Sequence, residues 1–172
     1  MKIKLQNVRL SFPSLFQKAV FEGKEGKFEA TFLLDKESHA SLISEINDKI
    51  DKFLTSKFPG QAVPKSIKRT CFQDGDTKDY DGYANQMAIK GGSNRRITII
   101  DRDKAPLTEE DGKLYAGCYV NAVLELWYSD HNLGGKQVLA NLNGVQFVKD
   151  GEAFGDGDSN ALDDFDELND EF

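Results

Sequence analysis

The sequence predicts a mainly β domain with one long α-helix, followed by an acidic C-terminal tail. Short runs rich in β-branched and aromatic residues, separated by Gly, Pro, Asn and Asp, recur along most of the chain. In one stretch alone the apolar residues recur three and four positions apart, which is the helical period. The chain has 172 residues, of which 39% are hydrophobic, and this favours a single domain with a real core.

The first half of the chain contains three predicted strands and the helix. The strands cover Ile3–Leu10, Leu15–Phe21 and Phe28–Leu34. The helix extends from about Glu37 to Ser56, with Asp35 or Ser38 as its N-cap.

The second half returns to strands. Ser66–Gln73 is one candidate, and Ala84–Lys90 is predicted to form a hairpin with Arg95–Asp101 across Gly91–Asn94. Tyr115–Tyr128 is a long strand, and Gln137–Lys149 is its expected partner. Three strands, a helix and further strands are compatible with an OB-fold-like five-stranded Greek-key barrel with extra strands over residues 1–149. A different Greek-key barrel is the alternative.

Charge is unevenly distributed along the chain. Residues 150–172 carry ten acidic side chains and no Lys or Arg. Residues 1–149 therefore hold all 22 basic residues and 19 of the 29 acidic ones, a net charge of +3. Such asymmetry indicates a basic ligand surface on the body and a separate acidic tail, which we expect to be disordered.

The acidic tail also carries spaced apolar side chains. Acidic and apolar residues together favour a segment that docks on a basic, partly apolar partner, whereas a purely solubilising tail is the plainer alternative. The predicted partner-binding residues are Asp163, Asp164, Phe165, Asp166, Glu167, Asp170, Glu171 and Phe172.

Basic residues lie beside aromatic ones at several positions, a combination suited to single-stranded nucleic acid. Lys and Arg attract phosphates, while flat rings stack on unpaired bases at ~1–3 kcal/mol each. Along the long strand, even-numbered residues from Cys118 to Leu126 are apolar and predicted to face the core, whereas Tyr119 and Trp127 lie on the opposite face. Packing of these rings under a loop or the helix is the alternative. The predicted DNA-binding residues are Lys68, Arg69, Phe72, Tyr80, Tyr83, Lys90, Arg95, Arg96, Tyr119 and Trp127.

The sequence contains no catalytic motif. The two His and two Cys residues lack the short ligand spacing of a zinc site, and no Ser elbow, kinase set or dinucleotide fingerprint occurs. We therefore expect no enzyme activity, metal or other cofactor. No apolar run approaches the roughly 20 residues of a membrane span, and the start lacks the apolar core of a signal peptide, so a protein of the reducing cytoplasm without disulfides is expected.

Three segments resemble a family of bacteriophage proteins long catalogued as of unknown function. They are Leu114–Ala122 followed by Trp127, Leu142–Phe154, and the opening Val8–Pro13. Members of that family are single-stranded DNA-binding proteins with an OB fold. The resemblance implies sequence-independent binding of single-stranded DNA during phage replication and recombination, in the cytoplasm of the infected bacterial host.

The tail, which ends in Phe172, is similar to the tails of phage and bacterial single-strand binders. That likeness implies phage or host replication proteins as tail partners, competition between tail and DNA for the basic groove, and scope for self-association.

Two other classes of function are left open by the sequence. In the first, the body is a scaffold and the acidic tail mimics DNA to occupy a host factor. In the second, a nuclease holds a metal with the loop carboxylates Asp74, Asp76, Asp79 and Asp81, although such a loop is more typical of a solvated turn.

Overall fold

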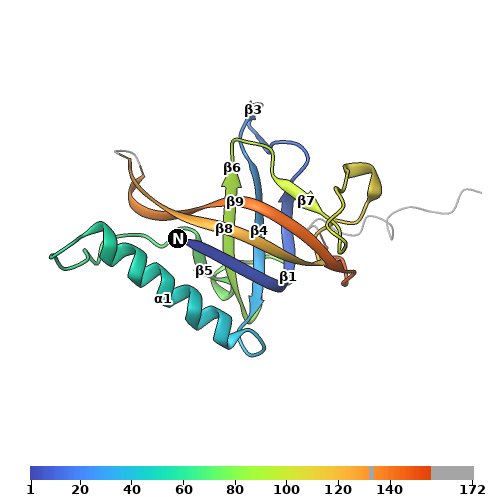
Figure 1. Ribbon diagram of the computed structural model, residues 1–172. Coiled ribbons are helices and arrows are strands. Elements are labelled where there is room, and N and C mark those ends of the chain that lie inside the picture. Colours follow the sequence, from blue (N-terminus) through green and yellow to red (C-terminus); the bar gives the residue numbers. More distant parts are fainter. Residues whose placement is uncertain (132–133, 156–172) are drawn as a thin grey trace, which may run out of the picture.

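The structure, a computed structural model, describes residues 1–131 and 134–155. Figure 1 shows its long strands wound into a barrel, with the helix packed below it. The elements are β1 (Lys2–Ser14), β2 (Val20–Phe21), β3 (Lys24–Glu25), β4 (Phe28–Asp35), α1 (Ala40–Lys57), β5 (Phe72–Asp74), a 3-10 turn (Gly75–Thr77), β6 (Gln86–Ser93), β7 (Thr98–Ile100), a second 3-10 turn (Glu109–Asp111), β8 (Tyr119–His131) and β9 (Gly135–Lys149).

Five strands close the barrel in the order β1, β4, β6, β9 and β8. β4 pairs antiparallel with β1 and β6, and β8 pairs antiparallel with β1 and β9. The ring closes where Gly92 of β6 lies opposite Asn141 of β9 in parallel register. This arrangement is the Greek-key order of an OB-like barrel, so the predicted fold class is confirmed.

One large apolar cluster fills the barrel. Cys118, just before β8, and the even-numbered β8 residues from Val120 to Leu126 are at most 3% exposed, which confirms the predicted core face of this strand. α1 adds a stripe of four buried side chains at helical spacing: Ile46, Ile50, Phe53 and Leu54. Full burial of such a side chain contributes roughly 1.5–3 kcal/mol, so this stripe fixes the helix against the barrel.

The predicted helix is present, but its N-cap is not the expected one. α1 begins at Ala40, and His39 is the N-cap without a side-chain hydrogen bond. The Asp35 carboxylate instead accepts hydrogen bonds from the backbone N–H groups of Glu37 and Ser38, and these bonds lower the pKa of Asp35. Asp35 therefore stabilises the turn that precedes the helix. No helix in the described part of the chain is long and apolar enough to cross a membrane.

Two predicted strands are much shorter than expected. Of Leu15–Phe21, only Val20–Phe21 is a strand (β2), which forms a small hairpin with β3. Of Ser66–Gln73, only the last two residues belong to a strand, β5, which pairs with the edge of β6. In both segments the remaining residues have no continuous partner strand. Alternation of apolar and polar residues in the sequence therefore does not produce a ladder of backbone hydrogen bonds there.

The predicted hairpin across Gly91–Asn94 is wrong. β6 continues through both glycines to Ser93, and β7 pairs with β9 instead of β6. A Cβ on Gly91 would lie 2.6 Å from the side chain of Leu124, so Gly91 allows close packing inside the barrel and does not make a turn. The predicted pairing of the last two long strands is confirmed by β8 and β9, although β8 begins at Tyr119 and not at Tyr115.

The first residues of the predicted tail lie against the barrel. The Phe154 N–H donates to Ala116 O (3.0 Å), and the Gly155 N–H donates to the Asp81 carboxylate (2.7 Å). The Arg9 guanidinium lies 4.1 Å from the centre of the Phe154 ring. We call residues 150–155 the tail root. The folded part of the chain therefore extends at least to Gly155, and residues 156–172 lie outside the described residues.

Candidate nucleic-acid interface

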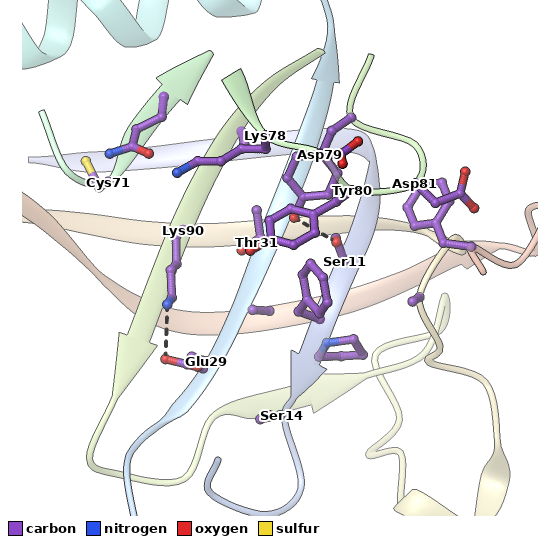
Figure 2. Close-up of a pocket in the computed structure, with 18 of the residues that line it drawn as sticks. Ser11, Ser14, Glu29, Thr31, Cys71, Lys78, Asp79, Tyr80, Asp81 and Lys90 are labelled. Atoms are coloured by element: carbon purple, nitrogen blue, oxygen red, sulfur yellow. Dashed lines mark hydrogen bonds and ion pairs between the residues drawn. The ribbon is translucent and has the colours of Figure 1, made fainter. Parts of the chain in front are cut away.

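A groove of about 970 Å³ crosses the outer face of β4 and β6 (Figure 2). Its floor contains Thr31 and Lys90, and its walls are the end of β1, the β2–β3 hairpin and the loop before β6. β4 and β6 are the second and third strands of the barrel. In OB folds this face and the loop between the first two strands bind oligonucleotides.

Two exposed aromatic rings stand over the groove. Phe12 is 56% exposed and Tyr80 is 53% exposed, with their ring centres 5.0 Å apart and their planes at 74°. Tyr83 lies beside both rings, 6.2 Å from Phe12 and 5.2 Å from Tyr80, and is only 3% exposed. The Tyr83 hydroxyl shares a 2.9 Å hydrogen bond with Ser11 Oγ. Tyr83 therefore acts as a fixed support for two rings that are free to stack.

The backbone at Phe12 has an uncommon conformation. Its φ of +46° lies in the left-handed region, which bulky residues rarely adopt, and the residue precedes Pro13. The pairing of β1 with β4 also shifts register between Ser11 and Ser14. Strain and bulges of this kind cluster at functional sites, where they redirect a side chain. Here they accompany a ring that stands out over the groove.

The β2–β3 hairpin adds a third ring at the margin of the groove. Phe21 is 75% exposed and contributes to the groove lining, and its neighbour Val20 is 71% exposed. Large apolar side chains exposed to this degree at a hairpin tip have little to gain from folding alone, so they favour a binding role.

The groove itself is not strongly basic. Its lining contains Lys78 and Lys90 together with the carboxylates of Glu29, Asp79 and Asp81. Lys90 Nζ lies 3.5 Å from Glu29 Oε2, so one of the two lysines is already paired. The basic surface indicated by the overall charge must therefore come from residues beyond the groove lining.

Asp74 and Asp76 fix the loop that carries Tyr80. Lys36 Nζ lies 2.7 Å from Asp74 Oδ1 and 2.6 Å from Asp76 Oδ2, and Asp76 also accepts a hydrogen bond from the Asn85 N–H. The hydrogen bond from Lys36 lowers the pKa of Asp74, and those from Asn85 and then Lys36 lower the pKa of Asp76. These two carboxylates are thus occupied in holding the loop in place.

Two rings predicted to stack are buried. Phe72 is 5% exposed within the main core cluster, and Tyr83 is 3% exposed beneath Phe12 and Tyr80. Neither presents a free face to a base, so the prediction of direct stacking does not hold for them in this structure. Phe72 belongs to β5 at the sheet edge, where its side chain faces inward.

The predicted cations lie in three separate places. Lys90 is in the groove, whereas Arg95 and Arg96 are exposed on the loop that follows β6. Lys68 and Arg69 lie near the C-terminal end of α1, where Arg69 forms an ion pair with Asp51. The structure therefore brings Tyr80 and Lys90 together but sets the other cations outside the groove.

The two predicted rings of β8 lie away from the groove. Trp127 is 36% exposed, with Lys27 Nζ 5.9 Å from its ring centre. Tyr119 is half-buried beside the tail root, with the cations of Arg9 and Lys149 at 5.6 and 4.8 Å from its ring centre. The predicted partner-binding residues of the tail, from Asp163 to Phe172, lie outside the described residues.

Phe12, Phe21 and Lys78 were missed by reasoning from the sequence. Phe12 stands next to Pro13 and resembles a strand end, and Phe21 resembles an ordinary residue of a longer strand. A sequence pattern does not reveal a positive φ or a bulge. The one available signal was the pair of consecutive apolar residues Val20 and Phe21 beside a Gly-rich turn, where a two-residue hairpin exposes both.

Comparison with known proteins gives consistent results over the whole length. The family model of the single-stranded DNA-binding protein of Enterobacter phage Enc34 matches residues 1–172. The chain is 42% identical over 176 aligned residues to putative protein p50 of Acyrthosiphon pisum secondary endosymbiont phage 1, covering 98% of this chain and 94% of that protein.

Solved structures show the same architecture. The single-stranded DNA-binding protein of bacteriophage Enc34 in complex with single-stranded DNA superposes with a TM-score of 0.77 and 28% identity, covering 90% of this chain and 89% of that chain. The single-stranded DNA-binding protein gp2.5 of bacteriophage T7 has a TM-score of 0.60 at 12% identity, covering 98% and 97%, and shares the fold. The chain therefore belongs to the family of phage single-stranded DNA-binding proteins represented by that of Enc34.

Proposed function

We propose that this protein binds single-stranded DNA, without sequence preference, in the groove over β4 and β6. The exposed pair Phe12 and Tyr80, supported by the buried Tyr83, is the observation that carries the proposal. Every base has a flat face, so ring stacking tolerates any sequence, but it requires bases that are not already paired in a duplex. The Enc34 relative, whose solved complex contains single-stranded DNA, supports the assignment.

The groove suits stacking more than charge attraction. Its lining carries three carboxylates and two lysines, so base contact supplies the preference for single strands there. Phosphates would be met at the margins of the groove by exposed cations such as Arg95 and Arg96. Binding should consequently weaken with added salt, because each phosphate contact releases counterions.

We further propose that the acidic tail competes with DNA in cis. The tail root ends at Gly155, which itself lines the groove, and Phe154 is held there by Arg9 and by packing over Gly82. Eight acidic residues follow Gly155 in the sequence. A tethered segment has a high local concentration near its point of attachment. These carboxylates therefore compete with DNA phosphates for exposed cations such as Arg95 and Arg96.

The same tail is proposed to recruit replication or recombination proteins of the phage or host when DNA displaces it. Over Asp163–Phe172, six acidic residues are interspersed with Phe165, Leu168 and Phe172, which suits a basic and partly apolar surface on a partner. A tail peptide of this sequence, and one with Phe165 and Phe172 changed to Ala, would be tested against isolated phage and host replication proteins. Equal binding of both peptides would contradict the proposed role of the rings.

The groove assignment is tested by titrating labelled oligo-dT with wild type, Phe12→Ala, Phe12→Tyr and Tyr80→Ala. Loss of one stacking ring costs ~1–3 kcal/mol, or about 5- to 150-fold in affinity. Phe12→Tyr keeps the ring and should bind within about twofold of wild type, because stacking needs only the ring face. Wild-type affinity in both Ala variants would overturn the assignment.

A further inference from the structure

The single tryptophan of the chain stands on the outer side of the barrel wall, beyond the edge of the groove. Trp127 of β8 is 36% exposed and lies opposite Leu139 of β9. Successive residues of a strand point to opposite faces, and Leu126 is buried inside the barrel, so the Trp127 side chain faces outward. Two exposed lysines, Lys27 and Lys68, lie on the same outer side, and we call the three residues the tryptophan cluster.

Lys27 reaches Trp127 from the start of β4. It precedes the inward-facing Phe28, so its own side chain points outward. It lies beside Gly92 of β6, because a Cβ on that glycine would be 3.7 Å from Lys27 Cδ. The Lys27 ammonium lies 5.9 Å from the centre of the Trp127 ring, near the outer limit of a cation–π contact. Lys27 therefore links the two strands of the groove floor to the ring, which keeps exposed surface for a base.

Lys68 faces the same side of the wall by strand register. It forms a parallel bridge with Gln137 of β9, so the two side chains point to the same face. Gln137 and Leu139 flank the fully buried Val138, and both face outward. Two strand spacings and an offset of two residues place the Cα atoms of Lys68 and Trp127 roughly 12 Å apart.

The groove floor leads to this face through Thr70. Thr70 lines the groove, and its Oγ1 donates to Gln137 Oε1 (2.7 Å). The backbone of Cys71 joins the strands on either side, because its O accepts from the Lys90 N–H (2.8 Å) and its N–H donates to a β9 carbonyl (3.1 Å). β6, this segment, β9 and β8 are thus successive parts of the barrel wall, and the outer side of the wall continues from the groove floor to Trp127.

The two lysines of the cluster are available to phosphates. Both are exposed, and neither forms an ion pair with a carboxylate among residues 1–131 and 134–155. Glu125, which shares the outer face of β8, is half-buried and lies opposite Lys2 in the ladder with β1. An exposed ring with unpaired cations near it is the composition of a site for unpaired nucleotides.

We propose that the tryptophan cluster is a second subsite for the strand of DNA that is bound in the groove. A base stacks on Trp127, and Lys27 and Lys68 contact phosphates near that base. This inference rests on the proposed function of the groove. It explains how a groove whose lining carries more carboxylates than lysines serves a polyanion, because further phosphate contacts lie where the strand leaves the groove across β6.

The test of the ring compares two oligo-dT lengths near the limits of OB-fold site sizes, about 5 and about 16 nucleotides. Trp127→Leu removes the ring but keeps an apolar side chain, and it should weaken binding of the long oligonucleotide at least about fivefold. Trp127→Phe keeps a ring and should lose less. The groove alone can hold the short oligonucleotide, so both variants should bind it as wild type does. Thermal unfolding midpoints check that the fold is intact.

The test of the lysines sets the double variant Lys27→Ala/Lys68→Ala against Lys4→Ala/Lys52→Ala, which removes the same charge at exposed positions elsewhere. On the long oligonucleotide we expect the cluster variant to bind about 5- to 20-fold more weakly at low salt, with a salt slope shallower by about 1.4, or ~0.7 per lost phosphate contact. On the short one we expect the two double variants to behave alike.

Two results would overturn the subsite. One is equal behaviour of the two double variants on the long oligonucleotide together with wild-type affinity of Trp127→Leu, and the other is an equal loss on both lengths. Phe12→Ala distinguishes this failure from failure of the groove, because the groove ring should be needed at both lengths whether or not the tryptophan cluster binds DNA.

Discussion

Tyr83 shows how one buried residue can prepare a binding surface that it does not itself present. Its ring supports Phe12 and Tyr80, and its hydroxyl bonds to Ser11, which is 2% exposed. A sequence pattern recognises Tyr83 as an aromatic residue near basic ones, but it cannot separate a supporting ring from a stacking one. The distinction arises from the fold, which places the β1 end above the loop before β6.

Tyr83→Phe should therefore affect stability more than DNA binding. The change leaves the buried Ser11 hydroxyl without its partner, at a cost of ~1–3 kcal/mol in the free energy of unfolding. The supporting ring stays, so oligo-dT affinity should stay within about twofold. Chemical denaturation and binding titration of the same preparation measure both effects. In the Tyr83→Phe background, Ser11→Ala should recover part of the lost free energy of unfolding. If the effects of the two substitutions simply add, this would contradict a direct coupling between the Tyr83 and Ser11 hydroxyls.

Trp127 is the single tryptophan of the chain and is 36% exposed beside Lys27. A strand of DNA that reaches the outer face of β8 should quench the fluorescence of Trp127 on addition of oligo-dT. The fluorescence should recover when salt is added. Lys27→Ala should reduce the quenching. An unchanged emission spectrum at saturating oligo-dT would exclude Trp127 from the interface.

At the scale of elements, the loop between β5 and β6 depends on charge. Lys36 pairs with Asp74 and Asp76, whose pKa values are lowered, while the pKa of Lys36 is raised, chiefly by its hydrogen bonds to these carboxylates. Because the folded carboxylate pKa values lie below the ordinary 3.8, their contribution is present above that pH and is lost as the pH falls through the lowered values.

Lys36→Met should accordingly lower the thermal midpoint at pH 7, and its difference from wild type should shrink below about pH 4 as the carboxylates become protonated in both proteins. Unfolding scans between these pH values provide the measurement. Lys52→Met, on the exposed face of α1, is the matched control. A difference that persists undiminished into strong acid would show that Lys36 acts through packing and not through charge.

The tail root is a second element whose position can be tested. Gly82 has a φ of +85°, and a Cβ there would lie 2.3 Å from the Phe154 ring, whereas Gly112 has a φ of +63° and open space around it. Ala at either position carries similar backbone strain, roughly 1–2 kcal/mol, but only Gly82→Ala displaces Phe154.

Gly82→Ala should speed hydrogen exchange at the Phe154 and Gly155 amides and shift oligo-dT affinity towards that of the tail-free protein. Gly112→Ala should do neither. Two results would contradict the proposal that the tail root holds the acidic tail beside the groove. One is unchanged exchange protection of the Phe154 and Gly155 amides in Gly82→Ala, and the other is faster exchange with no change in oligo-dT affinity.

For the whole molecule, the parts predictable from sequence are those set by local pattern. The helix period, the alternation of β8 and its pairing with β9 follow from side chains close in sequence. The pairing of β7 with β9 and the Gly91 contact with Leu124 depend on barrel closure, which links residues far apart. The same limit applies to the site, where Tyr80 and Lys90 were identified but Phe12 required a bulge and a positive φ.

The central claim is that rings in the groove hold unpaired DNA in competition with the chain's own acidic end. It is tested most directly by a salt titration of oligo-dT and duplex binding to residues 1–172 and to residues 1–155, since the shorter form keeps the tail root. Between about 50 and 200 mM salt, the shorter form should bind oligo-dT more tightly, most clearly at the lowest salt, and both forms should prefer oligo-dT to duplex. Equal affinity of the two forms at the lowest salt, or of either form for duplex and oligo-dT, would contradict the account.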